Sequence, residues 1–232
     1  MKNRIDSVGA LLALLVSGSA ACATEAVPPT PVLMPAQPVL SYRYDGSRGS
    51  AQVTRELGAG GFETLTGTLA LTAQQHSAAV RSSERVAIDG AGRLQRAEIA
   101  IEQANSVDVF TLDPSRGSVR IERAGSPSID WAVPQDAPWV YTPAALGDGS
   151  PSMTPVSSWV ALRAANGAAT VVRVLDPEHQ TSYLAPIDQV AVPTELGTTV
   201  TFGGDAVDAD ARFITELRLS GGALKLARAG SS

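Results

Sequence analysis

The segment that decides the fold is "VAIDGAGRLQRAEIAIE", which runs from Val86 to Glu102. Apolar and polar residues alternate up to Ile88 and alternate again up to Ile99 and Ile101. A period of two is that of a β-strand, whose successive side chains point to opposite faces of a sheet. The Asp89-Gly90 pair between the two runs is a strong hairpin signal. The segment therefore predicts two antiparallel strands joined by a short turn.

The same pattern recurs along the chain. "VDVFTLDPSRGSVRIER" turns at Asp113-Pro114, "ATVVRVLDPEHQTSYLAPIDQVAV" turns at Asp176-Pro177, and the tail "ARFITELRLSGGALKLA" turns at Gly221-Gly222. The segments "SYRYDGSRGSAQVTREL" and "FETLTGTLALT" supply three more strands near the front. About ten strands linked mostly by short hairpins are typical of one antiparallel meander. We therefore expect a mainly β fold in a single domain.

One segment, "TPVSSWVALRAANG", breaks the two-residue period. Thr154 is a suitable N-cap, Pro155 suits the first helical position, and Asn166-Gly167 is a good stop signal. Apolar residues recur at helical spacing in Val156, Trp159, Val160 and Ala164. The pattern predicts one short helix at about residues 155–165.

The first 21 residues have the parts of a secretory signal peptide: a positive start, a nine-residue apolar run and then small residues. "SAAC", which ends at Cys22, resembles the lipobox of bacterial lipoproteins, in which the cysteine carries the lipid. The alternative is ordinary cleavage at an Ala-x-Ala site before Thr24. Ala23 after Cys22 resembles lipoproteins that are sorted to the outer membrane. We therefore expect an exported, lipid-anchored protein of the cell envelope, facing the periplasm or the surface.

A proline-rich segment follows Cys22, and proline favours an extended, semi-rigid chain. This composition predicts a tether between the membrane anchor and the folded part. The expected organisation is a signal peptide at 1–21, an anchor cysteine and tether at 22–38, and a single β-rich domain at 39–232.

Composition and motifs exclude several classes of function. The chain has 18 Lys and Arg against 23 Asp and Glu, and this acidic balance argues against a nucleic acid partner. His76 and His179 lie in polar segments and are interpreted as loop residues. The acidic segment "GGDAVDADA" lacks the spacing of an EF-hand and is also interpreted as a solvated loop. No GxSxG motif or phosphate-binding loop occurs. We expect no metal, no cofactor and no enzymatic activity.

The aromatic residues are unevenly distributed. All three tryptophans and a tyrosine fall in one stretch of the sequence: Trp131, Trp139, Tyr141 and Trp159. One interpretation is that they cap the core where the helix meets the sheet, because tryptophan is usually mostly buried. The other is that they line an apolar ligand pocket, because such pockets are mainly apolar and aromatic.

The lipobox-like signal, the tether, the single meander and the late apolar helix together resemble a class of bacterial envelope proteins with an open, strongly curved β-sheet. The lipoprotein carriers LolA and LolB belong to it, as do uncharacterised glycolipid-binding domains. The resemblance implies a sheet curled into an open half-barrel around an apolar hollow that accommodates acyl chains. This chain departs from the carriers in having one helix where they have several.

Two functions follow from these patterns. The first is binding of an acyl chain or lipid in the curved sheet by the four aromatic residues, with Cys22 anchoring the protein. The alternative is a fully packed structural or protein-interaction domain that holds no small ligand and contacts another envelope protein. They differ in whether the concave face of the sheet is filled by side chains of the chain itself.

Overall fold

The computed structural model describes residues 39–73, 79–103, 106–143, 153–191, 198–202, 205–210, 212–219 and 224–229. The predicted signal peptide, anchor cysteine and tether lie outside these residues, as does His76. Among the described residues, no helix has both the length and the apolar character needed to cross a membrane.

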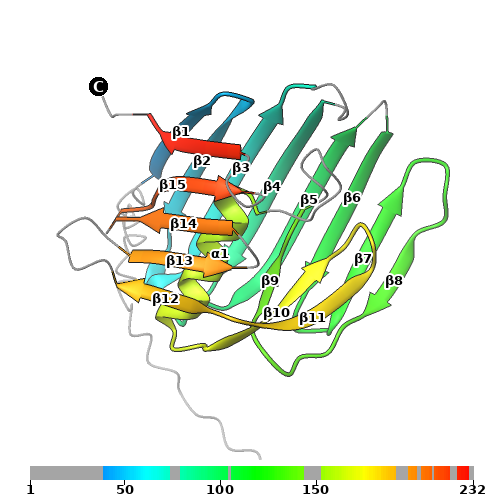
Figure 1. Cartoon of the computed structure of the whole chain (residues 1–232). Coiled ribbons are helices and arrows are strands. Elements are labelled where there is room, and N and C mark those ends of the chain that lie inside the picture. Colours follow the sequence, from blue (N-terminus) through cyan, green and yellow to red (C-terminus); the bar gives the residue numbers. More distant parts are fainter. Residues whose placement is uncertain are drawn as a thin grey trace, which may run out of the picture. The chain divides into compact units, whose positions relative to one another are not determined.

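Thirteen of the described strands form one large antiparallel sheet (Figure 1). They are β1 (Val39–Gly46), β2 (Gly49–Leu57), β3 (Glu63–Leu71), β4 (Val80–Ile88), β5 (Leu94–Gln103), β6 (Ser106–Asp113), β7 (Ser118–Arg123), β8 (Ile129–Ala132), β12 (Asp188–Ala191), β13 (Thr198–Phe202), β14 (Asp205–Ala209), β15 (Ile214–Leu219) and β16 (Leu224–Arg228). Two meanders, β1 to β8 and β12 to β16, meet where β1 pairs with β16 and Tyr44 lies opposite Arg228. A short 3-10 turn at Ala59–Gly61 links β2 to β3.

A second, three-stranded sheet lies beside the large one. It consists of β9 (Trp139–Tyr141), β10 (Val171–Asp176) and β11 (Thr181–Pro186) in the order β11-β10-β9. β9 runs parallel to β10, and the helix lies between them in the chain. Parallel strands need such a long crossover connection, so this pairing could not arise from a meander of hairpins. The predicted mainly β, antiparallel and open fold is confirmed, and the second sheet is an addition to it.

The predicted helix is confirmed as α1 (Pro155–Asn166). Thr154 Oγ1 accepts a hydrogen bond from the Ser157 backbone N–H at 3.1 Å, and Ser157 Oγ accepts one from the Thr154 N–H at 2.9 Å. This reciprocal pair satisfies two backbone donors that would otherwise lack partners at the start of the helix. Pro155 fills the next position, where no N–H is needed.

The large sheet curls around α1. The helix contacts β2, β3 and β4 of one meander and β15 of the other, and it also contacts β9 of the small sheet (Figure 1). Ten of its twelve residues are buried, so the helix is covered on all sides. The concave face of the sheet is therefore occupied by the chain itself wherever α1 lies.

Alternate residues of β3 to β7 point into this core, as the two-residue period requires. Ile99 of β5 lies opposite Phe110 of β6, which lies opposite Ile121 of β7, and all three are at most 1 % exposed. Burial of one such side chain contributes about 1.5–3 kcal/mol. The hairpin residues Val86 and Ile88 that decide the fold face the same core.

Gly67 allows the closest approach between the helix and the sheet. It occupies an inward position of β3, and a methyl group there would lie 2.3 Å from Val156 Cγ2. A contact this short cannot exist without movement, and Val156 is β-branched and therefore stiff on a helix. Glycine at this position thus sets how deeply α1 lies in the sheet.

We expect Gly67→Ala to destabilise the fold by about 1–3 kcal/mol, because the added methyl group overpacks the helix–sheet contact. Urea unfolding followed by circular dichroism measures the change. Thr68→Ala, on the exposed face of the same strand, should change stability by less than about 0.5 kcal/mol. Equal effects of the two substitutions would contradict this account of the packing.

Candidate functional site

The four aromatic residues predicted as ligand contacts occupy three different elements. Trp131 lies on β8 and is partly buried against the core, Trp139 and Tyr141 lie on β9, and Trp159 lies on α1. The last three are at most 4 % exposed. Each directs its polar atom to a different partner: the Trp139 indole N–H donates to the Pro134 carbonyl at 2.8 Å, whereas Tyr141 and Trp159 reach two buried carboxyl groups. Their role in ligand binding stays a prediction.

Glu63, at the start of β3, is the first of these buried carboxyl groups. Its Oε2 accepts hydrogen bonds from Arg55 Nε of β2 at 3.0 Å and from the Trp159 indole N–H at 2.8 Å. Its Oε1 lies 3.0 Å from Arg163 Nε of α1. Only 4 % of the Glu63 side chain is exposed. Two guanidinium groups and an indole N–H therefore compensate the charge that burial would otherwise leave isolated.

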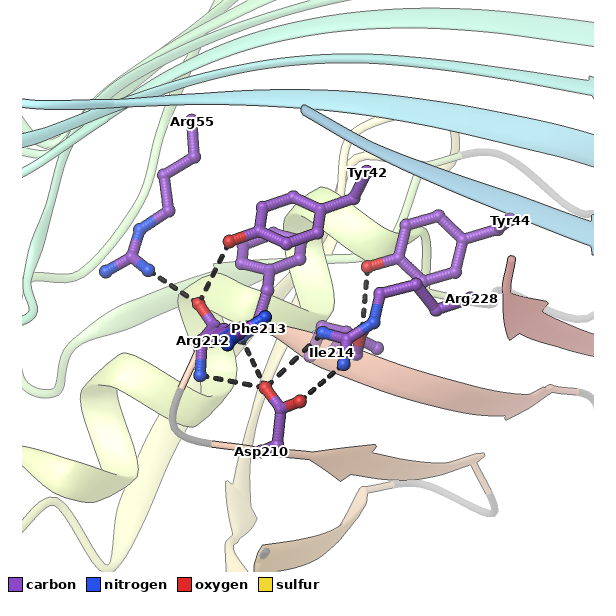
Figure 2. Close-up of polar contacts among 8 residues, drawn as sticks. All are labelled: Tyr42, Tyr44, Arg55, Asp210, Arg212, Phe213, Ile214 and Arg228. Atoms are coloured by element: carbon purple, nitrogen blue, oxygen red, sulfur yellow. Dashed lines mark hydrogen bonds and ion pairs between the residues drawn. The ribbon is translucent and has the colours of Figure 1, made fainter. Parts of the chain in front are cut away.

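A column of rings and guanidinium groups extends from this carboxylate to the other meander. The Arg55 guanidinium lies 4.8 Å from the Trp159 ring centroid, and Trp159 lies 4.5 Å from Phe213. Phe213 stacks on Tyr42 at 4.6 Å, and Arg228 lies 5.8 Å from the Tyr42 centroid (Figure 2). Aromatic pairs and cation–π contacts each contribute roughly 0.5–1.5 kcal/mol. The column joins β1, β2, α1, the turn before β15, and β16.

Hydrogen bonds fix the turn that carries Phe213. Asp210 Oδ1 accepts from the backbone N–H groups of Arg212 and Phe213 at 2.8 and 2.9 Å, and Arg228 pairs with the same carboxylate (Figure 2). The bond from Arg228, aided by the two N–H groups, lowers the pKa of Asp210 to about 2. The Arg212 carbonyl accepts from Arg55 Nη1 at 2.6 Å. The turn is thereby held against both β16 and β2.

The acidic segment around Asp208 was wrongly assigned to a solvated loop. It forms β14, and Asp208 pairs with Arg218 of β15 at 2.9 Å. An arginine on the neighbouring strand thus replaces solvent as the partner of the Asp208 carboxylate. Among the described residues, no group of three or more His, Cys, Asp or Glu could hold a metal ion. His179 lies in the turn after β10, as expected, with Nδ1 2.8 Å from Asp176 Oδ2.

Glu84, on β4, is the second buried carboxyl group. Its Oε2 accepts a hydrogen bond from the Tyr141 hydroxyl at 2.5 Å, and the nearby side chain of Thr154 also favours the carboxylate and lowers its pKa. Loss of hydration outweighs both effects and raises the pKa of Glu84 to about 7. Burial, together with Glu84, raises the pKa of Tyr141, so the phenol stays protonated. Glu84 thus links β4 to β9, close to Thr154, the residue before α1.

Neither buried acid was singled out from the sequence, although a signal was present. Glu63 stands in the same alternation phase as Leu65 and Leu69 of β3, and Glu84 stands in phase with Val86 of β4. A charged residue in the apolar phase of a strand indicates a group that must find internal partners. The sequence does not reveal which partners, because they come from segments far along the chain.

Two open clefts adjoin each other on the surface, with volumes of about 550 and 540 Å³. They share Arg93, Asp136, Ala137 and Pro138. Trp139 lines the first cleft, and Val171 and Leu184 line the second. Asp136 is held by two hydrogen bonds from Arg173 at 2.6 and 2.7 Å, and these lower its pKa. The clefts are thus walled by both apolar groups and a fixed ion pair.

Comparison with known proteins leaves the family open. No family model and no curated protein matches the chain. One similar solved structure is that of a beta-barrel-like protein of a domain of unknown function, DUF1849, from Brucella abortus. It is 7% identical, with a TM-score of 0.41, over 82% of this chain and 93% of that chain. The fold itself defines the class of the chain: a mainly β protein whose open, curved antiparallel sheet encloses one helix. The finer resemblance to LolA and LolB stays a prediction.

We expect Glu63→Gln to destabilise the fold by about 3 kcal/mol, because the neutral amide leaves Arg55 and Arg163 without their shared counter-charge. Urea unfolding at neutral pH measures the loss. Glu98→Gln is a matched control, since Glu98 pairs with Arg96 while 48 % of its side chain is exposed. That pair should contribute less than about 1 kcal/mol. A loss at Glu63 no larger than that of the control would show that the cluster does not hold α1.

Proposed function

We propose that the chain is a protein-interaction domain of the bacterial cell envelope, anchored by lipid on Cys22, whose curved sheet is filled by its own helix rather than by a ligand. The observation that carries this proposal is the enclosure of α1. Ten of its twelve residues are buried between the two meanders. Carriers of acyl chains need space at this place, whereas a packed sheet presents only its outer surfaces and edges to a partner.

The small sheet offers a surface for such a partner. Its exposed apolar side chains include Val171 of β10 and Tyr183 and Leu184 of β11, which are 41 %, 46 % and 51 % exposed. β11 is an edge strand, and it carries no charged residue. Uncharged edges with exposed apolar side chains favour contacts with other proteins. Val171 and Leu184 share one face of the small sheet and Tyr183 lies on the other, so this apolar edge supports an interaction role independently of the filled concave face.

Binding of an apolar ligand is the second candidate, and one observation favours it. Trp139 lines a cleft of about 550 Å³, which is within the range of small-ligand sites. Under this second candidate function, the acyl chain or lipid occupies the surface cleft beside β9. The clefts reach Leu184 on the other side, so both candidates use the same end of the small sheet.

Photo-crosslinking in the cells that produce the protein tests the interaction role. A photoreactive amino acid at Leu184 should give a discrete crosslinked protein, because this side chain is half exposed on the proposed surface. The matched control carries the same group at Thr68, which is exposed on β3. The same crosslinks at both positions, or none at Leu184, would contradict an interaction surface on the small sheet.

Mass spectrometry of the full chain separates the anchor from a bound ligand. We expect a covalent acyl mass that is lost in Cys22→Ala, and no acyl species in a solvent extract of the folded Cys22→Ala protein. A stoichiometric lipid in that extract would favour the second candidate, and its loss in Trp139→Ala would place it in the first cleft. An unmodified Cys22, or a mature chain that begins after it, would contradict the lipid anchor.

A further inference from the structure

Glu84 stands where three elements of the chain meet: β4, β9 and the start of α1. It projects inward from the middle of β4, and only 4 % of it is exposed. From β9 of the small sheet, the Tyr141 hydroxyl reaches it at 2.5 Å. The side chain of Thr154, the N-cap residue of α1, also favours the carboxylate of Glu84 and lowers its pKa, so it lies close to this group. One carboxyl group on the large sheet therefore meets both the small sheet and the start of the helix.

The described residues around Glu84 provide no opposite charge. On the neighbouring strands, Gly67 of β3 and Ile99 of β5 lie directly opposite it. The charged residues of β4 and β5 are otherwise exposed: Arg81, Arg85, Arg96, Glu98 and Glu102. Among the described residues, the titratable group that contacts Glu84 is thus the neutral phenol of Tyr141.

The charged residues of α1 and β3 pair with groups other than Glu84. Arg163 is the only charged residue in the sequence of α1, and it pairs with Glu63. Glu63 is the only charged residue of β3, and it also contacts Arg55 and the Trp159 indole. The partial positive charge of the α1 N-terminus favours a carboxylate at Glu84, but this contribution is smaller than that of a full counter-ion.

A neutral carboxyl group fits this site better than a carboxylate. The protonated acid can still accept the hydrogen bond from Tyr141 on one oxygen, and because it is neutral it needs no counter-ion. An ionised group there would be a buried charge without a partner cation, and such a charge favours any state in which water reaches it. The protonated form of Glu84 therefore favours the closed structure, and the ionised form favours an opened one.

We propose that Glu84 is a proton-operated latch: protonated, it holds α1 and β9 against the large sheet, and ionised, it releases them. The pKa of about 7 supports this, because it places the change near neutral pH. In an opened state the group would titrate near its ordinary value of 4.5. The folded state thus binds the proton more tightly, so the closed form is most stable below pH 4.5 and opening increases as pH rises through 7.

Hydrogen exchange of the full chain tests the latch. With these two pKa values, the population of the opened form should rise about tenfold between pH 6 and pH 8. After correction for intrinsic exchange, peptides covering α1 and β9 should lose protection by that factor. Peptides from β6 and β7 should change much less. A uniform change in all four elements would indicate global unfolding and would overturn the latch.

Matched variants identify the group responsible. In Glu84→Gln the protection of α1 and β9 should become independent of pH, because the amide cannot ionise. His179→Gln should leave the wild-type response unchanged, although this histidine is also titratable and lies in the turn between β10 and β11. A wild-type response in Glu84→Gln, or its loss in His179→Gln, would overturn the assignment.

A second variant keeps the proposal falsifiable if Glu84→Gln does not fold. Tyr141→Phe removes a hydrogen bond that favours the carboxylate, so it should raise the pKa of Glu84. The pH at which α1 and β9 open should then move upward. An unchanged or lowered midpoint would contradict the proposal.

Discussion

The rest of the structure depends on enclosing a helix inside one continuous sheet. A helix that is buried on every side cannot turn polar groups toward water, so each of them needs an internal partner. Thr154 and Ser157 satisfy the donors at the start of α1, and Glu63 meets Trp159 and Arg163 farther along it. Gly67 leaves room for Val156 and so allows the helix to approach the sheet closely. These few residues determine how the two meanders come together.

The two inward-facing acids solve the same problem in opposite ways. Two guanidinium groups contact Glu63, whereas the hydrogen-bond donor described at Glu84 is the Tyr141 hydroxyl and burial raises the pKa of this acid to about 7. The contact at Glu84 therefore responds to pH near neutrality.

Local patterns were sufficient to predict the hairpins and the helix. The turn after Ile88, the turn at Asp113-Pro114 and the limits of α1 follow from signals within a few residues of each other. The parallel pairing of β9 with β10 was not predictable, because it joins Trp139 to Arg173 across the whole helix segment. For the same reason the partners of the buried acids were missed. Sequence alternation shows that Glu84 faces inward but not that Tyr141 meets it.

The pairing of β1 with β16 brings Tyr44 opposite Arg228, and Tyr44 donates a hydrogen bond to the Ile214 carbonyl at 2.9 Å. The first and last strands of the sheet are thus neighbours, and the loop between them must close before their contacts form. Contacts of such long sequence separation slow folding. The complete sheet therefore cannot assemble before β16 has been synthesised. A chain that lacks β16 lacks the pairing through which the two meanders become one sheet.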